Sequence, residues 1–91
     1  MKVKLTITEM DASRRTAKED TIKEWLATTE SDKHLTAGRA RSILRLEVDE
    51  LSHWNYIGLP VLVKMGNSWR AMKSTDRDGI WRYYYIEEIK E

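Results

Sequence analysis

The first residues of the chain alternate between polar and apolar side chains. Val3, Leu5 and Ile7 lie on one side of an extended backbone, and the residues between them lie on the other. Such an alternation is typical of a strand that is buried on one face. The pattern therefore predicts an N-terminal strand over residues 2–9.

The spacing of the apolar residues then changes. Two Thr-x-x-Glu pairs, which begin at Thr16 and Thr21, have the spacing of a capping box, in which a hydroxyl and a carboxylate satisfy the first free amides of a helix. Behind them, large apolar residues recur at helical spacing: Ile22, Trp25 and Leu26. These features predict a helix over residues 16–29.

Residues 36–51 fit more than one structure. A helix that Thr36 caps gathers the apolar residues on one side, but it brings Glu47 into that apolar stripe, where an unpaired carboxylate is costly. A strand that starts at Ser42 removes this cost, because three apolar residues then alternate with charged ones: Leu44, Leu46 and Val48. A short helix that runs into a strand is a third interpretation. The sequence leaves all three open.

The last third of the chain has the pattern of antiparallel strands joined by turns. Pro60 stands where a strand can begin, and Gly66-Asn67 suits the tight turn of a hairpin. Residues 76–79 predict a second turn. After it, aromatic residues alternate along a further strand: Trp81, Tyr83 and Tyr85. This region predicts a three-stranded meander.

These elements predict an α+β domain. It has an N-terminal strand, one or two helices and a three-stranded antiparallel meander, all within one small globular domain spanning residues 1–91. A composition of 41% hydrophobic and 34% charged residues suits such a domain. The longest purely apolar stretch, residues 59–63, is too short to cross a membrane, so we expect no membrane partner and a cytoplasmic location.

The composition offers little for catalysis or metal binding. The chain has no cysteine, which excludes disulfides, thiolate nucleophiles and cysteine-based metal sites. Its two histidines, His34 and His53, are far apart in the sequence, and no glycine-rich loop suited to a phosphate is present. We therefore predict no catalytic residue, no metal site and no cofactor, and a function other than that of an enzyme.

Basic residues are concentrated in two segments, although the formal net charge is only +1. One is a basic helix at 36–46, in the helical interpretation of that segment, and the other is the predicted hairpin at 61–74. On exposed elements, arginine reaches guanine edges, and lysine and serine reach phosphates. The candidate nucleic-acid contacts are Arg39, Arg41, Ser42, Arg45, Lys64, Arg70 and Lys73.

Two helices, the second of them basic, followed by a hairpin are similar in outline to a winged helix-turn-helix. This resemblance implies a small regulator that binds DNA or another nucleic acid. The arginines of residues 36–46 would be its principal contacts, and the hairpin would lie along the phosphate backbone.

The C-terminal half also resembles small SH3-like or Tudor-like barrels. The resemblance rests on residues 49–54, 58, 61–63, 69–71 and 79–84. It implies a strand over residues 42–49 and aromatic side chains near a binding groove. Barrels of this kind bind peptides, methylated side chains or nucleic acid, so the resemblance leaves the ligand open.

The aromatic residues indicate an alternative function. The chain has four tryptophans and four tyrosines but no phenylalanine, and large rings with a polar group are favoured at protein interfaces. The protein would then be a binding module or an inhibitor, for instance of a host or defence enzyme, since compact cysteine-free chains often come from phages or mobile elements. A homodimer through an open sheet edge is a further expectation. The candidate partner contacts are Trp54, Tyr56 and Tyr84.

Overall fold

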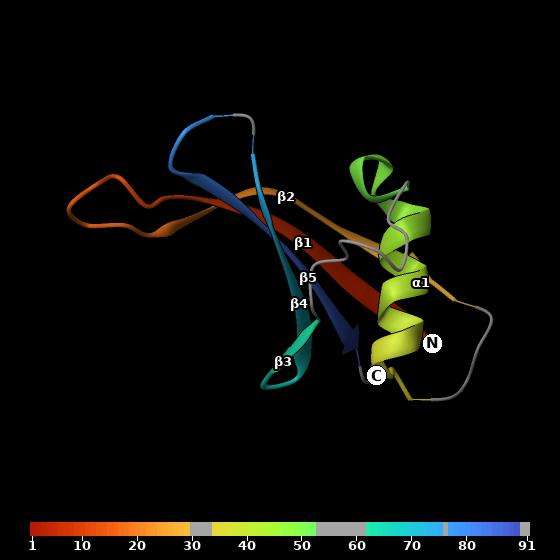
Figure 1. Cartoon of the computed structure of the whole chain (residues 1–91). Helices are drawn as coiled ribbons and strands as arrows, with labels where there is room; N and C mark the ends of the chain where they lie inside the picture. The colour runs from red at the N-terminus through yellow and green to blue at the C-terminus, as the bar shows by residue number, and fades with distance from the viewer. Residues whose placement is uncertain (30–33, 53–61, 76, 90–91) are drawn as a thin grey trace.

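Five strands form one antiparallel sheet, and a single α-helix lies across one face of it in the part of the chain that the structure describes (Figure 1). The computed structural model describes residues 1–29, 34–52, 62–75 and 77–89. Along the sheet the strands follow the order β2-β1-β5-β4-β3. The elements are β1 (Lys2–Asp11), β2 (Glu19–Thr28), α1 (Ala37–Glu47), the 3-10 helix η1 (Asp49–Leu51), β3 (Val63–Met65), β4 (Ser68–Ser74) and β5 (Ile80–Ile89).

The predicted N-terminal strand is confirmed as β1, which lies inside the sheet. Val3, Leu5 and Ile7 are buried in the core. β1 pairs with β2 on one side and with β5 on the other, so Leu5 has Trp25 and Ile86 as its neighbours. A strand with a partner on each side satisfies its backbone hydrogen-bonding groups within the sheet. The alternation in the sequence therefore places the most apolar face of β1 in the core.

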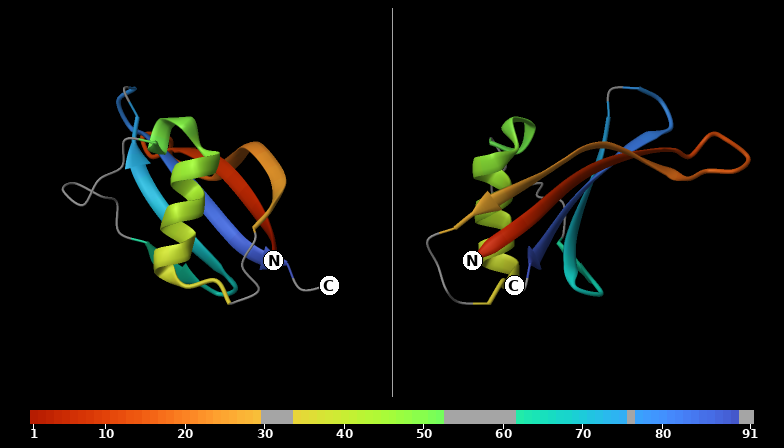
Figure 2. Two further views of the ribbon diagram at one scale, coloured as in Figure 1. Left: turned by 90° about the vertical axis from the view of Figure 1, so that its right-hand side faces the viewer. Right: turned by 180° about the vertical axis from the view of Figure 1, so that it is seen from behind.

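Residues 36–51 form a helix followed by a short 3-10 turn, so both interpretations that include a strand are wrong. Thr36 caps α1, because its side-chain oxygen accepts a hydrogen bond from the backbone N–H of Arg39 at 3.3 Å. Ala40 and Leu44 are buried between α1 and the sheet, and α1 lies across that face (Figure 2). The helical spacing of apolar residues thus matches the face that packs.

The burial cost that made the helix doubtful at Glu47 does not arise. α1 ends at Glu47, which is exposed, and Val48 already has an extended backbone. The Glu47 carboxylate accepts a hydrogen bond from the indole N–H of Trp25 at 3.3 Å. The end of the helix therefore places this carboxylate at the margin of the core, beside a donor on β2.

The helix predicted over residues 16–29 is wrong, because this segment forms strand β2. It pairs with β1 in an antiparallel hairpin, in which Trp25 and Ala27 pack against the core while Ile22 and Leu26 stay exposed. The helical spacing of the apolar residues is therefore not used. Backbone pairing with β1 and the partial burial of Trp25 outweigh a weak local preference for helix.

The predicted turns of the C-terminal meander join β3 to β4 and β4 to β5, although Asp76 lies outside the described residues. Gly66 has a φ of 61° at the first position of a two-residue turn, where a type II′ turn favours glycine. Gly79 has a φ of 78°, and its carbonyl accepts a hydrogen bond from the backbone N–H of Ala12 at 2.7 Å. A Cβ at Gly79 would lie 3.3 Å from the Cβ of Ser13. Glycine at position 79 thus lets the β4–β5 turn approach the β1–β2 turn, which contains Ala12 and Ser13.

The structure belongs to the predicted α+β class, with more sheet than the sequence indicated. The first helix of the winged-helix outline is strand β2, and the strand at 42–49 that the barrel resemblance implies lies mostly within α1. Neither arrangement is therefore present in the described residues. None of the helices in these residues combines the length and the apolar character needed to cross a membrane.

Candidate functional site

The two faces of the sheet differ in what covers them. One face packs against α1, whereas no described helix lies over the opposite face, which we call the open face (Figures 1 and 2). The open face consists of the side chains that alternate with the core residues along the strands. They are Lys2, Lys4, Thr6, Thr8 and Met10 of β1, Glu19, Thr21, Glu24, Leu26 and Thr28 of β2, Val63 and Met65 of β3, Ser68, Arg70, Met72 and Ser74 of β4, and Trp81, Tyr83, Tyr85, Glu87 and Ile89 of β5.

Three aromatic side chains form a column along β5 in the middle of the open face. The register gives each ring two neighbours: Met10 and Ser74 for Trp81, Thr8 and Met72 for Tyr83, and Thr6 and Arg70 for Tyr85. The rings of Tyr83 and Tyr85 stack with their centroids 6.5 Å apart. Trp81 and Tyr85 are half-buried, whereas Tyr83 between them is only 6% exposed, so the accessible part of the column lies mainly at its two ends.

Polar contacts hold this aromatic column in place. The Arg70 guanidinium lies 5.1 Å from the centroid of the Tyr83 ring. The Tyr85 hydroxyl donates a hydrogen bond to the Glu19 carboxylate, and Thr8 Oγ1 donates to Glu19 Oε1 at 2.9 Å. Burial and the Glu19 carboxylate raise the pKa of Tyr85, so its phenol stays protonated and keeps donating at neutral pH. The column is therefore fixed before any partner binds.

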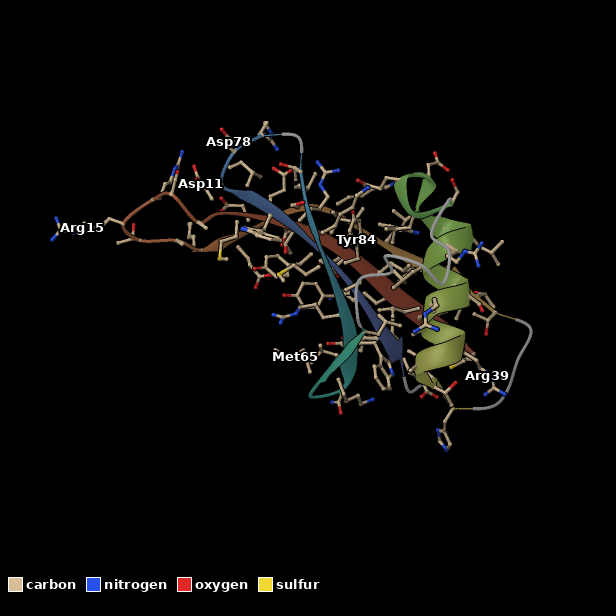
Figure 3. The ribbon with its side chains drawn as sticks, viewed as in Figure 1. Asp11, Arg15, Arg39, Met65, Asp78 and Tyr84 are labelled. Carbon is tan, nitrogen blue, oxygen red and sulfur yellow. The ribbon has the colours of Figure 1, made fainter. Side chains whose placement is uncertain are left out.

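Apolar side chains around the column remain exposed to solvent. Met72 is 43% exposed, Leu26 is 58% exposed, and Val63 and Met65 are also exposed. Figure 3 shows Met65 on β3, on the side of the sheet away from α1. An antiparallel sheet with one solvated face usually carries polar residues there, and an exposed apolar patch commonly marks an interaction site. The open face is therefore the candidate binding surface.

The charges of the open face balance. Its three basic residues are Lys2, Lys4 and Arg70, and its three acidic residues are Glu19, Glu24 and Glu87, so its formal net charge is zero. Lys4 Nζ lies 3.3 Å from a carboxylate oxygen of Glu24. The open face consequently carries no electrostatic preference for a polyanion.

An ion-pair network lies on the other face of the sheet, toward α1. Arg82 contacts Glu9 of β1, and its Nη1 lies 2.6 Å from Oε2 of Glu50 in η1. Arg77 also contacts Glu9, at 2.7 Å. The Arg82 hydrogen bond holds the pKa of Glu9 below its ordinary value, and burial together with Glu50 raises the pKa of Tyr84. Because carboxylates neutralise Arg77 and Arg82, these two cations offer little to a phosphate.

Within α1, the candidate nucleic-acid contacts point in different directions. Arg41 and Arg45 are one turn apart and share a side of the helix, whereas residues two positions apart, such as Arg39 and Arg41, do not. The Arg39 guanidinium donates to the His34 carbonyl at 2.8 Å, near the N-terminal end of α1 (Figure 3). The Ser42 hydroxyl donates to a carbonyl of the preceding turn at 3.1 Å. Of the three arginines, Arg41 and Arg45 are therefore brought together, and the Ser42 hydroxyl beside them is already used within the helix.

The candidate contacts of the hairpin lie on both faces of the sheet. Lys64 Nζ lies 5.0 Å from the centroid of the Trp69 ring, which packs against the core. Lys73 pairs in register with Arg82 on the same face, whereas Arg70 belongs to the open face. The basic residues that the sequence grouped thus do not form one surface.

Of the alternative partner contacts, Trp54 and Tyr56 lie outside the described residues. Tyr84 is only 1% exposed and belongs to the core, so it offers no surface to a partner, and this prediction is corrected. Its neighbours Tyr83 and Tyr85 belong to the open face instead, where Tyr85 is half-buried and Tyr83 is 6% exposed. The alternation in the sequence already put Tyr83 and Tyr85 on one side of the strand, but it did not show which side α1 covers.

Comparison with known proteins suggests no function, because no protein-family model, curated protein or solved structure matches the chain. Among the described residues, no group of three or more histidine, aspartate or glutamate side chains is placed to hold a metal ion. The open face is thus the feature from which a function can be argued.

Proposed function

We propose that this protein is a non-enzymatic domain that binds a protein partner through the open face. The observation that carries this proposal is the column of half-buried Trp81 and Tyr85 around the buried Tyr83, with the exposed Met72 beside it, on a sheet face with no described helix over it. Tryptophan, tyrosine, methionine and arginine are the residues most enriched in the centre of protein interfaces. All four types occur here, because Met72 and Arg70 of β4 lie beside the tryptophan and the two tyrosines of the column.

A protein fits this surface better than a single-stranded nucleic acid does. Proteins that stack bases on aromatic rings also line the path of the strand with positive charge. Here the net charge is zero, and Glu19 accepts hydrogen bonds from Thr8 and Tyr85 beside the column. A phosphate near Glu19 would meet a carboxylate, whereas an apolar protein surface with a few hydrogen-bond donors would not be repelled.

Replacing Met72 by glutamate is expected to weaken partner binding strongly. Met72 is exposed beside Tyr83, so the substitution brings a charge into the centre of the proposed interface without emptying the core. Proteins captured from cells that encode this chain are identified by mass spectrometry, which also tests whether the partner is a host or defence enzyme. Binding of the purified partner is then measured by calorimetry, and Met72→Glu should weaken it by tenfold or more, about 1.4 kcal/mol.

Leu46→Glu is the matched control, because Leu46 is 84% exposed on α1. It should bind the partner as the wild type does. Circular dichroism and thermal unfolding establish that both variants are folded. Equal affinity of Met72→Glu and Leu46→Glu, or equal loss in both, would rule out the open face as the binding surface.

A second candidate function, binding of nucleic acid by α1, is favoured by one observation. Arg41 and Arg45 share a side of the helix, and neither forms an ion pair within the described residues. Arg45 is exposed, and Arg41 is half-buried with its Nε inaccessible, so the terminal nitrogens of the two guanidinium groups are what could reach neighbouring phosphates or a guanine edge. This candidate corresponds to the regulator that the basic sequence segments indicate, with fewer contacts than those segments predict.

Salt dependence tests this second candidate directly. Fluorescence anisotropy with a mixed-sequence duplex and with single-stranded DNA, at roughly 50 mM and 200 mM salt, should show affinity falling steeply with salt. The double variant with Arg41→Ala and Arg45→Ala should bind at least about tenfold more weakly, while Arg15→Ala, in the exposed β1–β2 turn, should change little. Absence of binding at low salt excludes this function.

A further inference from the structure

The two edges of the sheet differ greatly in length. β3 forms one edge with only three residues, whereas β2 forms the other with ten. An edge strand presents unpaired N–H and C=O groups along its outer side, and a long one is a template for another strand. Most side chains of β2 are exposed, and Leu26 is 58% exposed. β2 is therefore the edge that can accept a further strand.

A break in the register limits the part of β2 that is regular. The pairing with β1 shifts between Ile7 and Thr8, which leaves Ile22 as an extra residue on β2. Such a bulge bends the strand and disrupts any ladder built across it. The regular stretch thus runs over residues 23–28, with Trp25 and Ala27 toward the α1 side and Leu26 on the open face.

We propose that a second copy of this chain pairs antiparallel with β2, about a two-fold axis that passes beside Leu26. In a symmetric pair of this kind each residue lies opposite one residue of the other copy, and both lie on the same face of the sheet. The axis at Leu26 gives these opposite pairs: Leu26 with Leu26, Trp25 with Ala27, Glu24 with Thr28, and Lys23 with Thr29.

Side-chain complementarity selects this register over its neighbours. An axis at Lys23 or at Glu24 sets two like charges directly opposite each other, which is destabilising. An axis at Trp25 sets Glu24 against the exposed Leu26, and an axis at Ala27 sets Leu26 against a threonine. Only the axis at Leu26 covers that leucine with an apolar side chain. It also faces the large Trp25 with the small Ala27.

This pairing joins two sheets into one of ten strands, because each copy contributes the five strands of its sheet. Since the two-fold axis is perpendicular to the sheet, both open faces lie on the same side and meet along β2. The pairing uses backbone groups and Leu26 rather than the aromatic column. It is therefore independent of the proposed function and is tested separately.

Cysteine cross-linking tests the register. The natural chain has no cysteine, so Leu26→Cys carries a single thiol. In the proposed dimer the two residues at this position are directly opposite, with Cα atoms about 4.5–5.5 Å apart, within the range that a disulfide spans. Lys23→Cys is the matched control on the same strand, because its two copies would be six positions apart, about 20 Å.

Under mild oxidation, Leu26→Cys should run as a covalent dimer on a non-reducing gel, and Lys23→Cys should stay a monomer. Cross-linking of neither variant, or of both equally, would overturn the proposed register. A covalent dimer from Met72→Cys but not from Leu26→Cys would mean that two open faces pack together, and it would equally overturn the edge pairing.

Sedimentation equilibrium supplies a test without a thiol. A contact between two edge strands alone buries little surface and is therefore weak, so dimerisation of the wild type is measured at protein concentrations from roughly 10 µM to 1 mM. Leu26→Lys sets two like charges opposite each other and should raise the dimer dissociation constant about tenfold or more. Leu46→Lys makes the same change at an exposed leucine of α1 and should leave it unchanged. A monomeric wild type, or a Leu26→Lys variant that dimerises equally well, would refute the proposal.

Discussion

Leu44→Ala is expected to lower the free energy of unfolding by about 3 kcal/mol. Leu44 is 1% exposed and packs in the core between α1 and the sheet, so its truncation removes apolar contacts and leaves a cavity. Leu46 lies two positions further along the same helix and is 84% exposed. Leu46→Ala should therefore change the free energy of unfolding by less than about 0.5 kcal/mol.

Urea unfolding followed by tryptophan fluorescence measures both variants under the same conditions. Because the residue type, the substitution and the helix are the same, helix propensity cancels from the comparison. Similar losses of unfolding free energy in Leu44→Ala and Leu46→Ala would contradict the packing of the Leu44 side of α1 on the sheet. That packing also defines which face of the sheet is open.

Arg82→Met is expected to cost about 2 kcal/mol of stability, the second largest effect. The Arg82 side chain is only 28% exposed and bridges Glu9 of β1 to Glu50 of η1. Methionine keeps much of the aliphatic volume but leaves Glu50 without this partner. Arg45→Met, at an exposed position of α1, is the matched control and should be nearly neutral.

The same network makes stability depend on acid. The Arg82 hydrogen bond lowers the pKa of Glu9 in the folded state, so unfolding lets Glu9 bind protons more readily. The resulting stabilisation is present above the unfolded pKa, about 4.3, and it is lost as the pH falls through the lower folded pKa. Unfolding measured from about pH 6 to pH 3 should show this loss, with a shallower slope in Arg82→Met. Parallel pH curves for the two proteins would contradict the assignment to Glu9.

Alternation along the chain predicted β1 and the C-terminal strands, because each has one face on the core. The sequence predicted a helix in place of β2 for two reasons. Ile22, Trp25 and Leu26 stand at helical spacing, and the bulge at Ile22 breaks the period of two that marks a strand. This segment is a strand because it pairs with β1, and that pairing cannot be seen in the local sequence pattern. The uncertainty at Glu47 had a similar cause, since the Trp25 indole that accommodates its carboxylate is distant in sequence.

The candidate site was harder to predict than the fold. Grouping basic residues by their closeness in sequence ignored the alternation of a strand, which puts Arg70 and Lys73 on opposite faces because they are three positions apart. The aromatic column was visible as an alternation, but both faces of β5 are rich in large side chains. Only the position of α1 decides that Tyr84 belongs to the core and that Tyr83 and Tyr85 belong to the open face.

The place of β1 between β2 and β5 has a consequence for how the chain reaches its native state. Lys2 pairs with Ile89 and Asp11 pairs with Ile80, so the longest ladder of the sheet joins segments that leave the ribosome far apart in time. Before β5 is synthesised, β1 and β2 lack the central partner of the sheet, and a two-stranded hairpin by itself is marginally stable in water. Closure must wait for β5, and such distant contacts make folding slow, on the order of milliseconds to seconds.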